Sequence, residues 1–133
     1  MEKSKFQFSN PKLTRLHFVV HDDFVKTEKL DMAIHISVNC QKNLQEELDS
    51  DNSAYVTVTV SIGTEDNATP FYIEADESAH FRWDKSAFTE KQIEELLNQN
   101  AVALLISYLR PIIASLTAAS PFPVYNLPFI NLT

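Results

Sequence analysis

Glycine and cysteine each occur only once in the 133 residues of this chain, and their scarcity excludes several kinds of active site. A single glycine cannot build a glycine-rich phosphate-binding loop. The lone Cys40 cannot form an internal disulfide or a C-x-x-C redox pair, which agrees with a reducing compartment. The sequence also lacks an H-E-x-x-H metal motif and a nucleophile elbow. We therefore expect a protein that is not an enzyme and that uses no cofactor.

Basic residues are the next shortage, since 11 Lys and Arg oppose 18 Asp and Glu and leave a net charge of −7. A nucleic-acid-binding protein needs clustered Lys and Arg to neutralise phosphates, so we expect no nucleic-acid partner. An acidic surface favours solubility and suits basic partners instead.

Long apolar runs are missing as well. The N-terminal residues hold no apolar run of signal-peptide length. No stretch approaches the roughly 18 consecutive apolar residues that a membrane span needs. We therefore expect a cytoplasmic protein that does not insert into a membrane.

What the chain does contain is the composition of an ordinary globular protein, with 44% hydrophobic and 22% charged residues. Its length is enough to bury a core, so residues 1–133 are expected to form a single domain. Phe81 and Trp83 are expected in that core. Cys40 lies at the end of an apolar strand face, so burial is expected for it rather than reactivity.

Four segments place apolar residues at every second position, which is the pattern of a strand with one buried face. They cover residues 16–20, 30–40, 55–62 and 71–83, and the first is the weakest. Glu77 falls in the apolar phase of the last segment, which predicts a bulge or break at residues 76–78. Residues 63–69 hold the only glycine and predict a hairpin loop. Antiparallel pairing is expected because no helical crossovers separate the strands.

A long helix follows the last strand. Thr89 and Gln92 form a capping box at its start, and Phe88 and Ile93 have the spacing of a hydrophobic staple. From Ile93 onward, apolar residues recur with the helical period on a broad face. A helix reaching residue 119 would be about 46 Å long. A small four-stranded sheet cannot cover that length, so part of the helix is expected to pack against another subunit.

Pro111 interrupts this helical pattern. An internal proline removes one backbone hydrogen bond and clashes with the carbonyl four residues earlier, that of Ser107. We therefore expect a kink, or two consecutive helices, instead of a straight rod.

The loop at residues 120–129 carries three prolines and three aromatic residues. The prolines hold it extended and reduce the entropy lost when another segment packs on it. The rings of Phe122, Tyr125 and Phe129 would form an apolar surface beside the sheet. Two interpretations stay open at this point. The surface binds unfolded polypeptide without sequence specificity, or the rings attach the loop to its own sheet or to a neighbouring subunit.

Four histidines and two adjacent aspartates are the remaining candidates for a metal site. They are His17, His21, His35, His80, Asp22 and Asp23. His17 and His21 would lie roughly 13 Å apart along one strand, too far to bind one ion together. We therefore interpret these histidines as solvent-facing strand residues and expect no metal.

The residues from the middle of the helix to the end of the chain follow a recognisable order. A helix with Asn, Leu, Tyr and Arg leads into a Phe-Pro loop and an L-P-x-I-N ending. The residues concerned are Asn100, Leu104, Leu105, Tyr108, Arg110, Ile113, Leu116, Thr117, Phe122, Pro123, Leu127, Pro128, Ile130 and Asn131. This series resembles the C-terminal part of SecB, a family of bacterial export chaperones. The resemblance implies an α+β fold in which a four-stranded antiparallel sheet packs against one long C-terminal helix.

The chain departs from the SecB pattern at several positions. Ser107 stands where the family usually has proline, and Pro111 follows one turn later. Ser120 stands where a helix-ending glycine is common, and Phe129 replaces the second proline of a pair. The chain ends at Thr133, whereas SecB continues into a shorter second helix that covers part of the client groove. It is therefore similar to short, uncharacterised SecB-like proteins.

The resemblance implies an ATP-independent holdase that binds unfolded or precursor polypeptides in an apolar groove, with a role in protein export. It also implies a homodimer or homotetramer and makes the SecA motor a candidate partner. The alternative is a non-enzymatic oligomeric adaptor, or a chaperone dedicated to one partner, without general client binding.

Two sets of residues are the candidates for these interactions. The set expected to contact polypeptide comprises Phe122, Tyr125, Leu127 and Phe129. The set expected in the oligomer interface comprises Leu104, Leu105, Tyr108 and Ile112.

Overall fold

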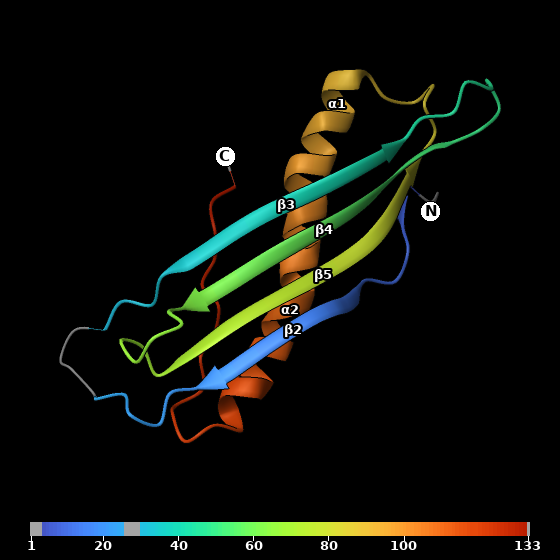
Figure 1. Cartoon of the computed structure of the whole chain (residues 1–133). Helices are drawn as coiled ribbons and strands as arrows, with labels where there is room; N and C mark the ends of the chain where they lie inside the picture. Colours follow the sequence, from blue (N-terminus) through green and yellow to red (C-terminus); the bar gives the residue numbers. More distant parts are fainter. Residues whose placement is uncertain (1–3, 26–29, 133) are drawn as a thin grey trace.

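The computed structural model describes residues 4–25 and 30–132, which form one antiparallel sheet and one long helix (Figure 1). The strands are β1 (Phe6–Phe8), β2 (Lys12–Val20), β3 (Ile34–Asn43), β4 (Asn52–Gly63) and β5 (Phe71–Trp83). The helix comprises α1 (Glu90–Glu95), a π-helical turn η1 (Leu96–Asn100) and α2 (Ala101–Ala118). The expected α+β class with a long C-terminal helix is confirmed, although the described residues form five strands and not four.

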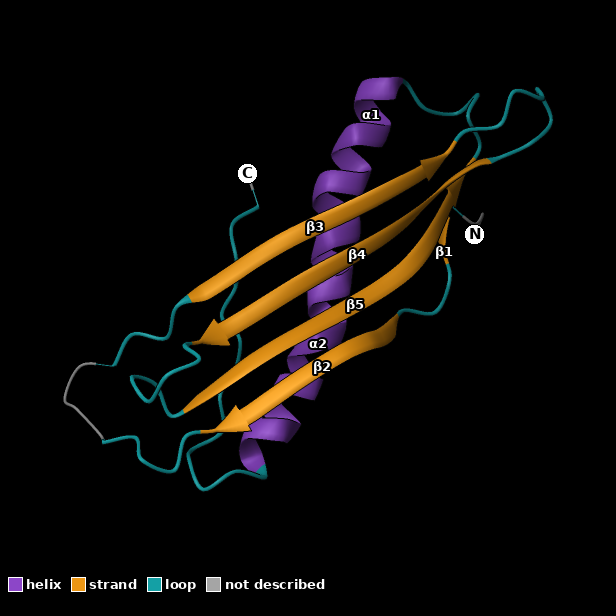
Figure 2. Cartoon of the chain, in the orientation of Figure 1, coloured by secondary structure: helices purple, strands orange, loops and turns teal. Residues whose placement is uncertain are grey.

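The five strands occupy only four positions in the sheet, as Figure 2 shows. Both β1 and β2 pair with β5 on the same side, and β4 and β3 follow on the other side. Pro11 lies between β1 and β2 and has no backbone N–H to donate, so the ladder is interrupted there. Ser9 spans the interruption, because its N–H donates to the His80 carbonyl at 2.8 Å. The first strand expected from the sequence is therefore part of an edge that two strands form together, β1 and β2, both paired with β5.

The bulge or break expected at residues 76–78 is only partly confirmed: β5 pairs without interruption on its β4 side, but its ladder with β2 is irregular opposite Asp76 and Glu77. Glu77 lies opposite Val58 on β4, so its side chain points toward the helix. The irregularity lies in β2, where the register shifts between Leu13 and Arg15 and leaves Thr14 as the extra residue. A central strand is held from both sides, whereas an edge strand can bulge at lower cost.

The hairpin loop after β4 confirms the expectation from the single glycine. Gly63 has a φ of 86°, a conformation that residues with a Cβ rarely adopt. A Cβ at this position would lie 2.2 Å from the Phe71 carbonyl oxygen. The N–H of Gly63 donates to the Ala33 carbonyl at 2.9 Å, just before β3 begins at Ile34. Residues 30–33, expected as strand, therefore lie in the connection between β2 and β3.

The start of the helix is as expected. The Thr89 hydroxyl accepts from the Gln92 N–H at 3.1 Å, and the Gln92 side chain accepts from the Thr89 N–H at 2.9 Å. Pro111 lies inside the unbroken α2, so the expectation of two helices meeting there is wrong. The departure from α-helical geometry occurs earlier, at η1, which the apolar spacing did not indicate.

The helix crosses one face of the sheet obliquely, and the core lies between the two layers (Figure 1). The largest fully buried side chains alternate along β4 and β5 and recur with helical spacing on η1 and α2. They include Val56, Val58, Val60, Ile62, Ile73, Phe81, Leu97, Val102, Leu105, Leu109 and Ile113. Phe81 and Trp83 belong to this core, as expected. Cys40 is half-buried, and burial raises the pKa of its thiol.

The opposite face of the sheet is open and polar. The hydroxyl groups of Thr14 and Thr57 lie 3.0 and 2.8 Å from that of Ser78. The Arg15 guanidinium forms ion pairs with Glu74 and Asp76. This face therefore carries a continuous hydrogen-bonded network and offers little apolar surface.

The helix from Glu90 to Ala118 is long and apolar enough, by length and composition, to cross a membrane. The expectation based on uninterrupted apolar runs missed this, because polar residues are interspersed along the helix. The same criteria are met by the core helix of a soluble protein, and 39% of the most apolar part of this helix is buried against its own sheet. The sheet-facing side accounts for part of the apolar character of the helix.

Candidate polypeptide-binding site

An apolar pocket of about 340 Å³ lies at the end of the sheet where β2 finishes and β5 begins. Three segments distant in sequence supply its walls: the β2–β3 connection, the β4–β5 hairpin and the loop after α2. The lining residues are Phe24, Leu30, Met32, Pro70, Phe71, Phe122, Pro123, Val124 and Tyr125. We call this the client pocket. Its volume suits one large apolar side chain or a short stretch of extended chain.

The loop after α2 is held in place by hydrogen bonds beneath its aromatic surface. The buried Thr117 hydroxyl donates to the Ile113 carbonyl and accepts from the Tyr125 N–H at 2.8 Å. The Ser120 hydroxyl accepts from the Phe122 N–H at 3.2 Å. Prolines 121 and 123 restrict the backbone further. The pocket wall is therefore preformed, which would lower the entropy lost when any ligand binds there.

The rings of the loop pack edge to face against rings from the other two segments. Phe122 lies 5.9 Å from Phe24, and Tyr125 lies 5.9 Å from Phe71. Burial raises the pKa of the Tyr125 phenol, so the phenol stays neutral in the physiological range. The pocket therefore presents uncharged aromatic surface.

The β2–β3 connection is anchored to the hairpin by His21. Its N–H donates to the Pro70 carbonyl at 2.8 Å, and its Nδ1 lies 2.9 Å from the Thr69 carbonyl oxygen. That nitrogen must carry a proton, because a carbonyl oxygen can only accept. His21 is buried, so its interpretation as a solvent-facing histidine is wrong: the chain turns inward as β2 ends at Val20.

The other strand histidines lie on the open face. The ring of His17 lies 6.0 Å from Tyr72, and that of His80 lies 4.6 Å from Tyr55. Within residues 4–25 and 30–132, no three His, Cys, Asp or Glu side chains gather in a way that could hold a metal ion.

The four loop residues expected to contact polypeptide do not form one surface. Phe122 and Tyr125 line the client pocket, whereas Leu127 is 5% exposed and belongs to the core. Phe129 is 97% exposed and lies apart from the pocket lining, with the Arg110 guanidinium 5.2 Å from its ring centre. Arg110 also donates to the carbonyls of Leu127 and Pro128 at 3.3 and 3.1 Å, so it holds this segment against the helix.

The sequence did not indicate the rest of the pocket lining. Leu30 and Met32 fitted the alternation of a strand, and Phe24 stood in a polar connection without a recognisable pattern. All three residues come to the pocket because the β2–β3 connection crosses from one edge of the sheet to the other. No local signal in the sequence encodes that crossing.

The four helix residues expected in an oligomer interface also divide. Leu105 is fully buried against its own sheet. Leu104 and Ile112 are half-buried, and Tyr108 is 37% exposed. These three residues follow one another at intervals of four along α2, and Leu104 also packs against the core. Arg110 is the one charged residue within α2.

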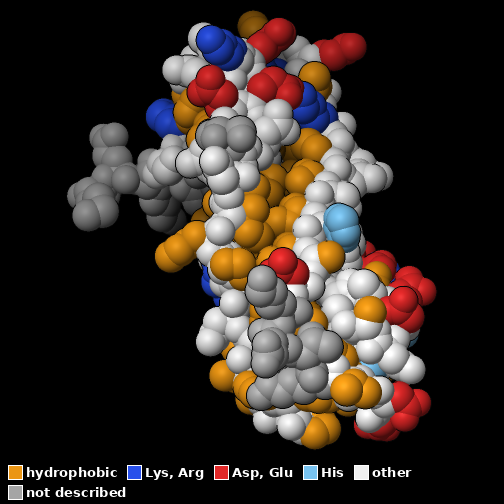
Figure 3. Space-filling model, turned by 90° about the vertical axis from the view of Figure 1, so that its left-hand side faces the viewer, with side chains coloured by type: hydrophobic (Ala, Val, Ile, Leu, Met, Phe, Trp, Pro, Cys, Tyr) orange, Lys and Arg blue, Asp and Glu red, His pale blue; other side chains and the backbone are white. Residues whose placement is uncertain are grey.

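A space-filling view shows how the apolar surface is distributed on the side of the molecule that carries the C-terminal segment (Figure 3). Hydrophobic side chains form a band through the middle of this side and continue toward the lower end. Lys and Arg lie mainly at the upper end, where α1 begins, together with Asp and Glu, and further Asp and Glu side chains lie at the lower right (Figures 1 and 3). The middle of this side is therefore apolar, and charged side chains lie toward both ends.

Sequence comparison relates this chain to known proteins. The model of the SecB family, described as preprotein translocase subunit SecB, matches residues 20–133. An uncharacterised protein of Methanocaldococcus jannaschii is 24% identical over 132 residues, which cover 98% of this chain and 81% of that protein.

Two solved structures are similar in fold. One is the SecB-like chaperone Rv1957 of Mycobacterium tuberculosis in complex with a ChAD peptide from the HigA1 antitoxin. It has a TM-score of 0.61 and 14% identity, and the match covers 94% of this chain and 90% of that one. The other is a protein of unknown function from Streptococcus agalactiae, with the same TM-score and identity, over 93% of this chain and 97% of that one.

Proposed function

This chain belongs to the SecB family, and on that premise we propose that it is an ATP-independent holdase that keeps polypeptides unfolded. The observation that carries the proposal is the client pocket: an uncharged, aromatic, preformed cavity of about 340 Å³. Apolar binding of this kind is non-directional, so it accepts many unfolded sequences. The net charge of −7 would keep the loaded complex soluble.

The proposed contacts follow from the lining. The loop after α2 would contribute Phe122 and Tyr125 to the contact, and the β2–β3 connection would contribute Phe24 and Met32. Phe129 offers a separate exposed ring beside Arg110, which a longer client segment would reach. Leu127 supports this segment from the core and does not contact the client.

A second candidate function is a chaperone dedicated to one partner, or an adaptor with this fold. The M. tuberculosis protein of similar fold binds a peptide from an antitoxin, which favours this alternative. At 14% identity, the similarity extends to the fold alone. The antitoxin partner is therefore a property of that protein. The two functions differ in the number of clients: several unrelated polypeptides for a general holdase, and one for a dedicated chaperone.

We further propose that the helices bring subunits together as a homodimer or homotetramer. The outer side of α2 supports this, because Leu104, Tyr108 and Ile112 form an uncharged stripe on it. Sedimentation would give the subunit number, and Tyr108→Glu should shift the population toward monomers. A protein that is monomeric at all concentrations would contradict the interface.

Export and the SecA motor remain proposals by family membership. An acidic patch that attracts a basic motor segment needs unpaired carboxylates. On the open face of the sheet, Glu74 and Asp76 are already paired with Arg15. We also propose that residues 1–133 act as one non-enzymatic domain in the cytoplasm.

Light scattering from several unrelated, chemically unfolded proteins tests the holdase proposal. The protein should suppress their aggregation, and Phe122→Ser should weaken that suppression. Leu48→Ser is the matched control, because Leu48 is 93% exposed and lies outside the pocket lining. Suppression of one client alone would favour the dedicated chaperone, and no suppression at all would contradict both.

A further inference from the structure

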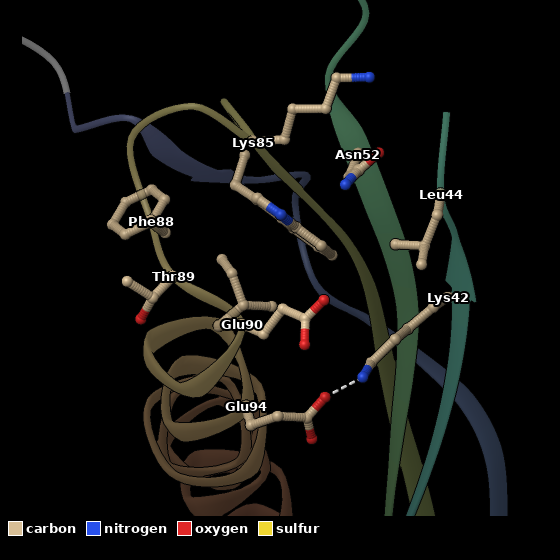
Figure 4. Close-up of a pocket in the computed structure, with 10 residues that line it drawn as sticks. Lys42, Leu44, Asn52, Lys85, Phe88, Thr89, Glu90 and Glu94 are labelled. Carbon is tan, nitrogen blue, oxygen red and sulfur yellow. Dashed lines mark hydrogen bonds and ion pairs between the residues drawn. The ribbon is translucent and has the colours of Figure 1, made fainter. Parts of the chain in front are cut away.

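A second pocket, of about 470 Å³, lies at the opposite end of the molecule, between the β3–β4 hairpin and the start of α1 (Figure 4). Its apolar lining comprises Leu44, Trp83, Phe88 and Ile93, and Trp83 and Ile93 are buried. Lys42, Lys85, Glu90 and Glu94 add charged groups to the lining. We call this the acidic-end pocket. None of its lining residues is shared with the client pocket.

Both lysines of the acidic-end pocket are engaged within the protein. Lys42 on β3 forms an ion pair with Glu94 on α1 (Figure 4). Lys85 donates to the carbonyls of Gln45 and Glu47 and so ties the hairpin loop to the end of β5. The ammonium groups of Lys42 and Lys85 therefore hold the pocket together and already have acceptors within the protein.

The charge that faces outward around this pocket is mostly negative. The hairpin loop and the first turns of the helix carry seven carboxylates, Glu46, Glu47, Asp49, Asp51, Glu90, Glu94 and Glu95, and one further exposed lysine, Lys91. Asp51 is paired with Arg82, and Glu94 with Lys42. No ion pair between described residues involves Glu46, Glu90 or Glu95. Phosphate-bearing partners such as nucleic acids or anionic lipids would be repelled here.

Two leucines are exposed among these acidic residues. Leu44 is 62% exposed at the pocket wall, and Leu48 is 93% exposed at the hairpin tip. Apolar side chains among carboxylates suit a partner that brings both apolar and positive groups. A second copy of this chain does not fit, since it would bring the same acidic residues into contact with themselves.

We propose that the acidic-end pocket docks a basic segment of another protein, with one large apolar side chain inserted between Leu44 and Phe88. Lys or Arg residues flanking that side chain would lie against Glu90 and the carboxylates of the hairpin loop. The apolar side chain supplies affinity and the flanking charges supply selectivity. This docking surface lies at the start of α1, whereas the client pocket lies beyond the end of α2, so both can be occupied together.

Trp83 makes the proposal directly measurable, because it is the single tryptophan of the chain and lines this pocket. The probe is a short synthetic peptide in which one phenylalanine is flanked on both sides by pairs of lysines. Titration of the whole protein should change the Trp83 emission with saturation, and the affinity should fall as salt is raised. The same peptide with glutamates in place of the lysines, or with serine in place of phenylalanine, should give no saturable change.

Two variants and a matched control locate the binding. Leu44→Ser should weaken the peptide about tenfold, the value for losing roughly one buried apolar side chain. Glu90→Gln should weaken it about threefold, as expected for one partly screened charge pair. Both residues are exposed, so folding should survive, which circular dichroism would check. Glu65→Gln in the β4–β5 hairpin loop, at the other end of the sheet, should bind like the unmodified protein.

Three results would overturn the proposal: no change in Trp83 emission, equal binding of the glutamate peptide, or binding that Leu44→Ser leaves intact. Loss of binding in Phe122→Ser would also overturn it, since the peptide would then occupy the client pocket. The outcome is independent of the holdase proposal, because aggregation suppression and the Trp83 signal report on different pockets.

Discussion

The two ends of the long helix offer contrasting surfaces built on the same sheet. At the end of α2, the client pocket is lined by aromatic and aliphatic side chains only. At the start of α1, the acidic-end pocket has an apolar floor under a rim of carboxylates and lysines. Polar groups stabilise both ends, but Thr117 and His21 lie beneath the client pocket, whereas Lys42 and Lys85 lie at the mouth of the acidic one.

This difference separates two kinds of recognition. Apolar burial does not depend on direction or sequence, so the client pocket suits many partners. Charge around an apolar socket discriminates between partners and is weakened by salt, so the acidic end suits a particular one. We therefore propose a tolerant surface at one end of the helix and a selective surface at the other.

The largest effect should come from a change that damages both ends together. Leu109 is fully buried between the helix and the sheet. Leu109→Ala should lower the free energy of unfolding by about 3 kcal/mol, from lost apolar burial and the cavity left behind. Urea unfolding measures this, and Ser115→Ala on the exposed side of α2 is the control. A loss below about 1 kcal/mol would mean that the helix is not packed on the sheet as described.

The next effect concerns Glu77, which lies between the two ends and faces the helix. It is 2% exposed, and its Oε1 has no hydrogen-bond partner among the described residues. Burial raises the pKa of this carboxyl above its ordinary value. A raised pKa in the folded state makes the protein lose stability as the pH rises through that pKa.

Glu77→Gln should therefore stabilise the protein by about 2 kcal/mol at alkaline pH, because burial disfavours the ionised carboxylate. The gain should shrink as the pH is lowered, because the protonated side chain resembles glutamine. Urea unfolding at an alkaline and at an acid pH gives the difference. Glu74→Gln, which removes an ion pair with Arg15 on the open face, should give no such gain. A stabilisation independent of pH would contradict this account of Glu77.

A smaller effect should separate the two ends. Thr117→Val keeps the shape of the side chain but leaves the Tyr125 N–H without its acceptor, at a cost of about 1.5 kcal/mol. The wall of the client pocket should loosen, and aggregation suppression should fall. The Trp83 response to the basic peptide should stay unchanged. If both readouts fell together, the two pockets would not be independent.

The smallest effect is expected at the opposite end. Thr89→Ala removes the N-cap hydrogen bond of α1 and should cost about 1 kcal/mol. Peptide binding at the acidic-end pocket should weaken, because Thr89 lines it. Suppression of client aggregation should persist. Unfolding and both binding assays on the same sample would show this. If Thr89→Ala reduced the suppression of client aggregation and left peptide binding intact, the assignment of clients to one pocket and of the peptide to the other would be wrong.

The sequence predicted those features that depend on neighbours along the chain. The capping box at Thr89 and the turn at Gly63 are local, and both were found. The extent of the strands depends on distant partners and was predicted less well. Residues 30–33 keep the alternation of a strand, but β4 ends at Gly63, so they have no strand left to pair with.

The same contrast between local and distant contacts explains which residues of the client pocket the sequence predicted. Phe122 and Tyr125 stood out because prolines and aromatic residues cluster around them in sequence. Phe24, Leu30 and Met32 reach the same pocket only through the crossing of the β2–β3 connection, which is a property of the whole sheet. Glu77 shows the converse: its place in the apolar phase predicts a bulge or break, whereas β5 continues through it with a buried carboxyl and the bulge lies in β2.

The most direct test of the central claim, that the client pocket holds unfolded polypeptide, uses Met32. The chain contains two methionines, and Met32 lines the pocket. With methyl-labelled methionine, the NMR signal of Met32, assigned with Met32→Leu, can be followed as an unfolded client is added. The account predicts that the Met32 signal shifts or broadens in proportion to client bound, and that Phe122→Ser reduces the effect. A Met32 signal that stays unchanged while the client binds would contradict it.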